Sequence, residues 1–216
     1  KPEEIQKIFP KSFYENKFGT VTVLEGGMEI QVTTYRIDNR YLDKRHPDSV
    51  TYTSDLQEDL ARRDFTVNAM ALQLRQGEDP EIIDPFNGKE DLRNKLIRSV
   101  GDPKERFNED ALRLMRAVRF AMQLDFRIEE NTLNAIKELA STLRFVSQER
   151  IRDEFKKMVM TSRAGYGIDV LRETGLLSVF LPEVVEGYGV GQNKHHIYDV
   201  YEHNKRALQY AAEQGF

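Results

Sequence analysis

The 216-residue chain contains no cysteine, which excludes disulfide bonds and thiolate metal sites. No apolar run approaches the roughly 18 residues that a membrane-spanning helix needs, and no signal-peptide pattern is present. Internal repeats and low-complexity tracts are also absent. These absences suit a cytoplasmic globular protein, and 39% hydrophobic residues are enough to bury a core, in more than one unit.

Two patterns of hydrophobic spacing divide the chain and together predict an α+β fold. Up to about residue 100 the apolar side chains alternate as in strands, with a hairpin turn at Gly26-Gly27. After Asp102 the spacing becomes helical. The predicted helices cover residues 2–9, 108–124, 129–140, 147–161, 163–174 and 198–213, and the predicted strands cover residues 19–24, 28–35, 65–74 and 81–84.

The segments between these elements also carry predictions. Residues 36–57 are polar and poor in aliphatic side chains, so we expect a long functional or disordered loop. Gly175 is expected to end a helix, and residues 182–191, with Pro182 and three glycines, to form a linker. The last helix is expected to have no partner in the chain. The resulting domains are 1–100, 101–185 and 186–216.

The helix predicted after Asn108 combines charged and apolar residues in an unusual way. Asp110 and Arg113 lie three positions apart and share a face, and Arg116 and Arg119 continue at the same interval. Most other positions are apolar, so the helix is predicted to be buried, and buried arginines need anionic partners. The pattern fits intrahelical ion pairs. It also fits a site where Asp110 and Arg113 meet a base edge and the other arginines meet phosphates.

A second polar cluster, Arg62-Arg63-Asp64, adjoins an apolar segment. One carboxylate beside two guanidinium groups suits a ribose hydroxyl next to a triphosphate, although a solvated strand edge has the same composition. Asn68 lies within the otherwise apolar segment 67–71, so its side chain is predicted to have a specific hydrogen-bond partner.

Several motifs occur in an order that resembles the class II tRNA nucleotidyltransferase family, which comprises the CCA-adding enzymes and the bacterial poly(A) polymerases. The resemblance covers roughly residues 1–185. Its motifs are Glu29 to Arg36, Tyr41 to Asp48, Arg62 to Ala71, Asp84-Pro85-Phe86-Asn87-Gly88 with Asp91-Leu92, Ile97 to Pro103, Glu109-Asp110-x-x-Arg113, and Ser147-Gln148-Glu149-Arg150-Ile151 with Glu154 and Lys157.

The resemblance implies a partial nucleotidyltransferase head, built on a polymerase-β-like mixed sheet, in residues 1–100. An all-helical neck and the start of a helical body domain would follow. It further implies that Asp110 and Arg113 select cytosine and adenine by edge hydrogen bonds. Arg63, Arg116 and Arg119 would contact the nucleotide or its phosphates, and Asp64 would contact the ribose.

Two further roles come from the same resemblance. Glu29 would be an auxiliary carboxylate beside the catalytic centre. The loop that contains Asp43, Arg45 and Asp48 would be the flexible element that switches specificity from CTP to ATP.

The chain departs from the family at the metal site. The family holds its two Mg²⁺ ions with an Asp-x-Asp pair, because paired carboxylates bind the metals that bridge the attacking hydroxyl and the triphosphate. This sequence contains no Asp-x-Asp. We therefore expect no metal site here, main ligands upstream of Lys1 in a longer protein, and an inactive chain on its own.

The C-terminal segment His195-His196-x-x-Asp199-x-x-x-His203 resembles the first helix of an HD-type domain, which some family members carry. A metal site and an ordinary helix entry both fit this pattern. The histidine–aspartate dipeptide that defines the HD metal centre is absent, so we assign no metal ligand here.

The net charge of −4 does not indicate an RNA partner. A basic face can still bind RNA, because local clustering of charge matters more than the total. Residues 144–163 hold six basic residues against three acidic ones, which fits either a phosphate-binding stripe or a mixed-charge surface. The residues assigned to RNA binding are Arg144, Arg150, Arg152, Lys156 and Lys157.

Together these observations predict part of a cytoplasmic tRNA nucleotidyltransferase that adds CCA to tRNA from CTP and ATP with Mg²⁺. A poly(A) polymerase, an A-adding or CC-adding enzyme, and a non-catalytic RNA- or nucleotide-binding module are the alternatives. A phosphohydrolase of the HD type would rest on the C-terminal histidines alone.

Overall fold

The computed structural model describes residues 2–15, 19–39, 49–193 and 195–215. Its contacts form two compact units, the first from residues 1–40 and 47–62 and the second chiefly from residues 63–216. No helix among the described residues is long and apolar enough to cross a membrane. The predicted domain boundary near residue 100 remains a prediction, since the units report contacts and not function.

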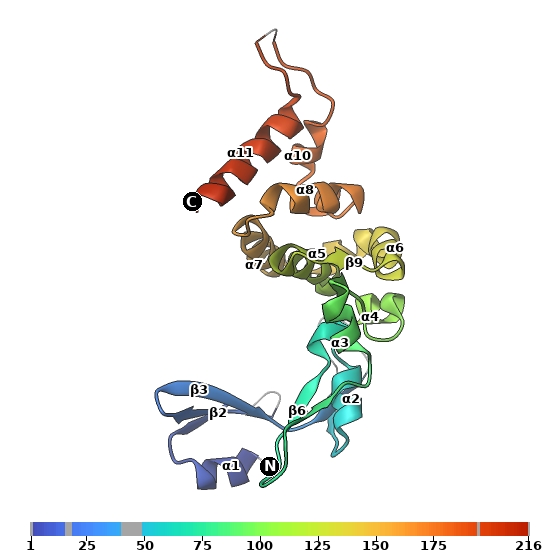
Figure 1. Cartoon of the computed structure of the whole chain (residues 1–216). Helices are drawn as coiled ribbons and strands as arrows, with labels where there is room; N and C mark the ends of the chain where they lie inside the picture. Colours follow the sequence, from blue (N-terminus) through green and yellow to red (C-terminus); the bar gives the residue numbers. More distant parts are fainter. Residues whose placement is uncertain (1, 16–18, 40–48, 194, 216) are drawn as a thin grey trace. The chain divides into compact units, whose positions relative to one another are not determined.

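The first unit contains an antiparallel sheet in the order β1 (Ser12–Glu15), β2 (Thr20–Glu25) and β3 (Met28–Thr33), with α1 (Pro2–Ile8) against β1 and β2 (Figure 1). Successive side chains of a strand point to opposite faces, and Val21 and Val23 of β2 are buried. Gly26 and Gly27 have φ angles of 57° and 79°, which other residues rarely adopt. The predicted hairpin is therefore confirmed.

The prediction of one long loop over residues 36–57 is wrong in its described parts. Strands β4 (Arg36–Asn39) and β5 (Ser49–Tyr52) pair antiparallel, and α2 (Leu56–Ala61) follows. These strands were not predicted because they lack an alternating aliphatic pattern, which main-chain pairing does not require. Asp55 begins α2 by accepting a hydrogen bond of 2.7 Å from the amide of Gln57.

The second unit opens with η1 (Thr66–Asn68), β6 (Ala71–Gln73), β7 (Glu81–Ile83), α3 (Gly88–Arg93) and β8 (Leu96–Ile97). The single strand predicted over residues 65–74 is wrong in its first half, where Phe65 makes only an isolated bridge to Ser99. The Asp64 carboxylate accepts from the Phe65 amide at 2.9 Å, and such local side-chain bonds compete with strand pairing. The chain then turns in η1 before β6 pairs with β7.

The helical part consists of α4 (Pro103–Glu109), α5 (Leu112–Leu124), α6 (Glu130–Leu139), η2 (Ala140–Phe145), α7 (Gln148–Val159) and α8 (Ala164–Glu173), with β9 (Arg127–Ile128) paired to β8. The predicted helices near 129–140, 147–161 and 163–174 are confirmed, as is the stop at Gly175, whose φ is 80°. The continuous helix over 108–124 is wrong. Asp110 has an extended backbone, and its carboxylate accepts from the amide of Leu112, which starts α5 as a separate helix.

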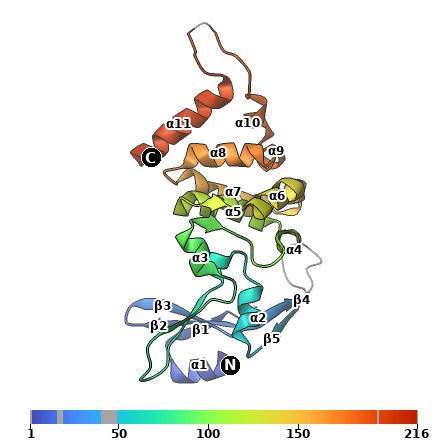
Figure 2. The same ribbon diagram turned by 45° about the vertical axis from the view of Figure 1, so that its right-hand side comes forward.

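Helix α5 forms the centre of the core of the second unit, and both α7 and α8 pack against it (Figures 1 and 2). The approach of α8 to α5 is close, since a Cβ at Gly167 would lie 2.1 Å from Sδ of Met122. The α5 residues that are buried include Leu114, Met115, Val118 and Met122. Helix α5, which carries Arg113, Arg116 and Arg119, is thus held by packing against α7 and α8.

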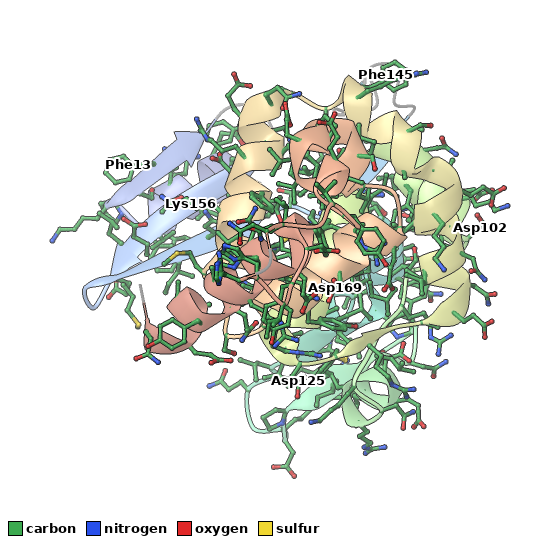
Figure 3. The ribbon with its side chains drawn as sticks, turned by 90° about the horizontal axis from the view of Figure 1, so that it is seen from above. Phe13, Asp102, Asp125, Phe145, Lys156 and Asp169 are labelled. Atoms are coloured by element: carbon green, nitrogen blue, oxygen red, sulfur yellow. The ribbon has the colours of Figure 1, made fainter. Side chains whose placement is uncertain are left out.

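Two predictions about the C-terminal part are wrong. Helix α9 (Leu177–Phe180) precedes the predicted linker, and α10 (Pro182–Glu186) occupies its first half; the last helix, α11 (Val200–Gln214), packs against α8. Asp169 of α8 accepts hydrogen bonds from Tyr201 at 3.0 Å and Lys205 at 2.9 Å, and it lies near the centre of the view in Figure 3. The sequence showed no partner because this contact depends on polar residues 32 and 36 positions apart.

Candidate functional site

The ion pair of Arg116 and Asp64 joins the two polar clusters that the sequence singled out. Nε and Nη2 of Arg116 donate to Oδ2 of Asp64 at 2.8 and 2.6 Å, across 52 positions of sequence. The Asp64 side chain is 9% exposed and the Arg116 side chain 33% exposed. The carboxylate is therefore enclosed, while the guanidinium group reaches solvent.

The second oxygen of Asp64 is also bonded. Its Oδ1 accepts from the Phe65 amide at 2.9 Å and from Nδ2 of Asn68 at 3.2 Å. The predicted specific partner of Asn68 is therefore Asp64, which confirms that prediction. These bonds hold the carboxylate in one orientation at the start of η1.

Asp110 forms a second pair, with Arg150 of α7. Nη2 of Arg150 lies 2.7 Å from Oδ2 and Nη1 lies 3.3 Å from Oδ1. The side chains are 15% and 24% exposed. Arg150 was predicted to bind RNA, and Asp110 was predicted to bind a base edge. In the structure Arg150 donates hydrogen bonds to the Asp110 carboxylate.

Arg113 points to other partners than Asp110. Its Nη1 donates to the carbonyl oxygen of Arg106 at 3.0 Å and to Oε2 of Glu109 at 2.5 Å. Glu109 also forms an ion pair with Arg106. The break between α4 and α5 separates Asp110 from Glu109, so that the carboxylates of these neighbours engage different arginines.

Arg119 belongs to a buried network between α5 and α7. Its Nε donates to Oε2 of Glu154 at 2.5 Å and its Nη1 to Oε1 of Gln123 at 2.6 Å. Lys157 contacts the other oxygen of Glu154 at 3.1 Å. The side chains of Arg119 and Glu154 are only 9% and 5% exposed, so they meet the requirement that buried charges be paired.

The other residues predicted for the nucleotide site are Arg63, Glu29 and the loop residues Asp43, Arg45 and Asp48. Arg63 is exposed, and Arg62 pairs with Asp59 at 2.7 Å within the first unit. Glu29 is exposed on β3, also in the first unit. Asp43, Arg45 and Asp48 lie outside the described residues.

Of the residues assigned to RNA, Arg152, Lys156 and Lys157 lie on α7 and Arg144 lies on η2, and they differ in their contacts. Arg152 pairs with its neighbour Asp153 at 3.1 Å, Lys157 with Glu154, and Arg144 stacks on Phe145 with 4.9 Å between Cζ and the ring centroid. Lys156 is exposed and borders an open pocket of about 520 Å³. The other residues that line this pocket are Gln123, Asp153, Lys157, Met160 and Thr161.

The C-terminal histidines form no metal centre with Asp199. That carboxylate accepts from the amides of Glu202 at 2.7 Å and Gly189 at 2.9 Å, and so caps α11. The His196 and His203 rings meet edge to face with centroids 5.9 Å apart. Within the described ranges, no group of three or more histidine or acidic side chains is placed to hold a metal ion.

Sequence reasoning did not identify Glu109 and Glu154 as partners of the arginine series. Glu154 carried a signal, because it falls between Ile151 and Met158 on the apolar face of α7, at spacings of three and four. A carboxylate at such a position predicts a buried cation. Nothing in the sequence indicated that this cation would be Arg119.

Comparison with known proteins identifies the family of the chain. Residues 1–98 match the family model described as the poly(A) polymerase head domain. Residues 125–187 match a model described as the probable RNA- and SrmB-binding site of polymerase A. The chain is 49% identical over 176 residues to the CCA-adding enzyme of Lactobacillus helveticus, an alignment that covers 81% of this chain and 43% of that protein.

Two solved structures have the same fold. One is the Bacillus stearothermophilus CCA-adding enzyme in complex with CTP, with 43% identity, a TM-score of 0.72, and coverage of 81% of this chain and 41% of that one. The other is a tRNA nucleotidyltransferase complexed with a primer tRNA and an incoming ATP analogue, with 27% identity, a TM-score of 0.67, and coverage of 89% and 52%.

The chain belongs to the tRNA nucleotidyltransferase and poly(A) polymerase family, with the α+β head and helical neck that the sequence predicted. It spans less than half the length of the curated relatives that it matches, such as 43% of the Lactobacillus helveticus protein.

Proposed function

We propose that this chain is the nucleotide-selecting part of a tRNA nucleotidyltransferase that adds CCA to tRNA from CTP and ATP. The observation that carries the proposal is the presence of two ion pairs near the start of α5. One joins Asp110, just before the helix, to Arg150, and the other joins Arg116, in the helix, to Asp64. A carboxylate for a ribose, an arginine for phosphates and a carboxylate for a base edge are held within one compact unit.

Base selection falls to Asp110 and Arg113 in this proposal. A cytosine or adenine edge offers an exocyclic amino group as donor and a ring nitrogen as acceptor, which a carboxylate and a guanidinium group complement. Both protein groups are already fixed, Asp110 by Arg150 and Arg113 by Glu109. Fixed donors and acceptors favour two bases over the others, because a wrong base leaves buried polar groups unpaired.

Ribose and phosphate binding fall to Asp64 and the arginines. The enclosed Asp64 carboxylate suits a hydroxyl donor, and the partly exposed Arg116 suits phosphate oxygens. Arg63 and Arg119 remain further candidates for contact with the nucleotide. Glu29 is proposed as an auxiliary carboxylate, and the segment with Asp43, Arg45 and Asp48 as the element that switches specificity.

The residues that the structure describes provide no set of ligands for a metal ion. The sequence lacks Asp-x-Asp, and the described side chains offer no cluster of three ligands. We therefore derive no step through a metal here. For the whole protein we propose a Mg²⁺ requirement with the principal ligands outside these residues, and a cytoplasmic location, where tRNA is the acceptor.

Nucleotide binding to this chain tests the proposal directly. By isothermal titration, CTP and ATP should bind at least tenfold more tightly than UTP and GTP, and Arg113→Ala should remove that preference. In the longer protein that contains this chain, labelled CTP and ATP should add to tRNA in the order C, C, A. Equal binding of all four nucleotides would contradict base selection here. Addition of A alone or a poly(A) tail would identify a different member of the family.

A further inference from the structure

The aromatic ring of Phe120 on α5 lies beneath two guanidinium groups. Cζ of Arg119 is 3.9 Å and Cζ of Arg116 is 5.3 Å from the ring centroid. Both distances are within the roughly 6 Å at which a cation and an aromatic face attract each other. The same ring meets Phe65 edge to face, with centroids 5.8 Å apart and an interplanar angle of 77°. Phe120 therefore contacts both the arginine series and the residue that follows Asp64.

The two arginines over this ring differ in what they can still bind. Arg119 is almost fully buried, and its Nε and Nη1 are engaged by Glu154 and Gln123. Arg116 is one-third exposed, and both of its bonded nitrogens, Nε and Nη2, donate to a single oxygen of Asp64. Its Nη1 has no hydrogen-bond partner in the part of the chain that the structure describes. Arg116 is thus the more accessible of the two to an incoming anion, because its Nη1 belongs to a side chain that is 33% exposed, whereas the remaining Nη2 of Arg119 belongs to one that is 9% exposed.

The two hydrogen bonds of Arg116 go to a single oxygen and therefore do not fix the orientation of its guanidinium plane. The guanidinium plane can still tilt about Oδ2 of Asp64, so the carboxylate alone does not fix where Nη1 points. A ring face below the guanidinium group removes this freedom, because the attraction favours one orientation of the cation over the ring. Arg116 and Phe120 lie four positions apart on α5, where side chains are neighbours.

We propose that Phe120 is a positioning residue for phosphate binding, whose ring sets the guanidinium plane of Arg116 so that Nη1 faces the triphosphate. The inference rests on the proposed nucleotide function. The ring is itself held in place, by Phe65 at its edge and by the stacked Arg119, which Glu154 anchors. Arg119 thereby supports the ring of Phe120, whether or not it also contacts the nucleotide.

Comparison of CTP with CMP tests the proposal, because the two ligands share base and ribose and differ only in phosphates. Titration of the purified chain in the presence of Mg²⁺ gives the ratio of the two dissociation constants. Phe120→Leu removes the ring face and should reduce the preference for CTP about three- to tenfold, the range of a single cation–π contact, with CMP affinity unchanged. Phe120→Tyr keeps a ring and should keep the preference.

Phe155→Leu is the matched control. Phe155 also meets a second ring edge to face, that of Phe180, with centroids 5.3 Å apart and an interplanar angle of 66°. None of the cation–π contacts of the described residues involves Phe155. Phe120→Met is the second variant in case Phe120→Leu does not fold, and circular dichroism verifies folding of each.

The outcomes separate this inference from the proposed function. If the unaltered chain bound CTP no more tightly than CMP, the proposed phosphate binding by Arg116 and this inference would both be wrong, while base selection would stand or fall with the comparison of the four nucleotides. If it preferred CTP and the Leu and Met variants kept that preference, only the role of Phe120 would be overturned. An equal loss in Phe155→Leu would also overturn it, since the effect would then be general destabilisation.

Discussion

Arg150 holds Asp110 through two hydrogen bonds, of 2.7 and 3.3 Å, between α7 and the break that precedes α5. The carboxylate predicted to read a base is therefore oriented by the helix predicted to bind RNA. Under the proposed function, nucleotide selection depends on the packing of α5 against α7, and changes in α7 should affect base binding through this pair.

The Arg150–Asp110 pair predicts a separation of two phenotypes on one helix. Arg150→Ala leaves Asp110 without its partner and should weaken CTP binding about tenfold, while tRNA binding changes less than twofold. Lys156→Ala, at an exposed lysine with no paired carboxylate among the described residues, should do the reverse. Titrations with CTP and with a tRNA transcript measure both. Loss of tRNA binding alone in Arg150→Ala would return this residue to the RNA surface.

Asp64→Asn should destabilise the chain by about 1–3 kcal/mol, because it removes the charge that pairs with Arg116 from an enclosed position. Urea unfolding followed by circular dichroism measures the loss. Asp153→Asn is the control, since its pair with Arg152 is 59% and 71% exposed and should change stability by less than about 0.5 kcal/mol. Equal effects of the two changes would show that the Asp64 pair is no stronger than a surface pair.

Glu154→Gln should cost about 3 kcal/mol of unfolding free energy, since Arg119 would remain buried without a counter-charge. The double change Glu154→Leu with Arg119→Met removes both charges and should cost less than Glu154→Gln alone. A double-mutant cycle in urea quantifies the coupling between the two positions. Additive losses would contradict the buried ion pair as the link between α5 and α7.

Gly88→Ala should destabilise the chain by at least about 2 kcal/mol, as overpacking against a rigid neighbour does. A Cβ at this position would lie 2.3 Å from the main-chain oxygen of Thr66, two residues beyond Asp64. Gly191→Ala is the control, because a Cβ there meets nothing within 4 Å. Thermal unfolding of the two variants gives the comparison. An unchanged midpoint for Gly88→Ala would show that η1 can move away from α3.

The pH dependence of stability has an identifiable contribution from Glu129, the cap of α6. Burial raises the pKa of this carboxyl, but hydrogen bonds from Thr132 and Asn131 and the charge of Arg98 outweigh it, so the pKa lies below the ordinary 4.5. A carboxyl whose pKa is lower in the folded than in the unfolded state stabilises the protein at pH values above its unfolded-state pKa. This stabilisation is lost as the pH falls through the folded-state pKa. Unfolding free energy should therefore decline below about pH 4.5. Glu129→Gln should make that decline shallower, and an unchanged slope would contradict the assignment.

The order of motifs along the chain was enough to predict the family. Local sequence patterns predicted the α+β class, the Gly26-Gly27 hairpin and the helices near 129–140, 147–161 and 163–174. These features are local: helical spacing of apolar residues, a pair of glycines with positive φ, and a glycine at a helix end determine them within a few positions. Asn68 could be predicted to have a partner, because a polar residue among Val67, Ala69 and Met70 needs one.

Only the tertiary structure decided which charges meet. Arg116 reaches Asp64 across 52 positions, Arg150 reaches Asp110 across 40, and Arg119 reaches Glu154 across 35. Spacing on a helix says which side chains share a face, but any acidic residue of the fold can complete an ion pair. The break at Asp110 is local instead, since a side-chain bond to the amide two positions later ends a helix that the apolar pattern would continue. The sequence by itself determined the candidate residues of the site, and the packing of α5 against α7 and against the segment at Asp64 determined their partners.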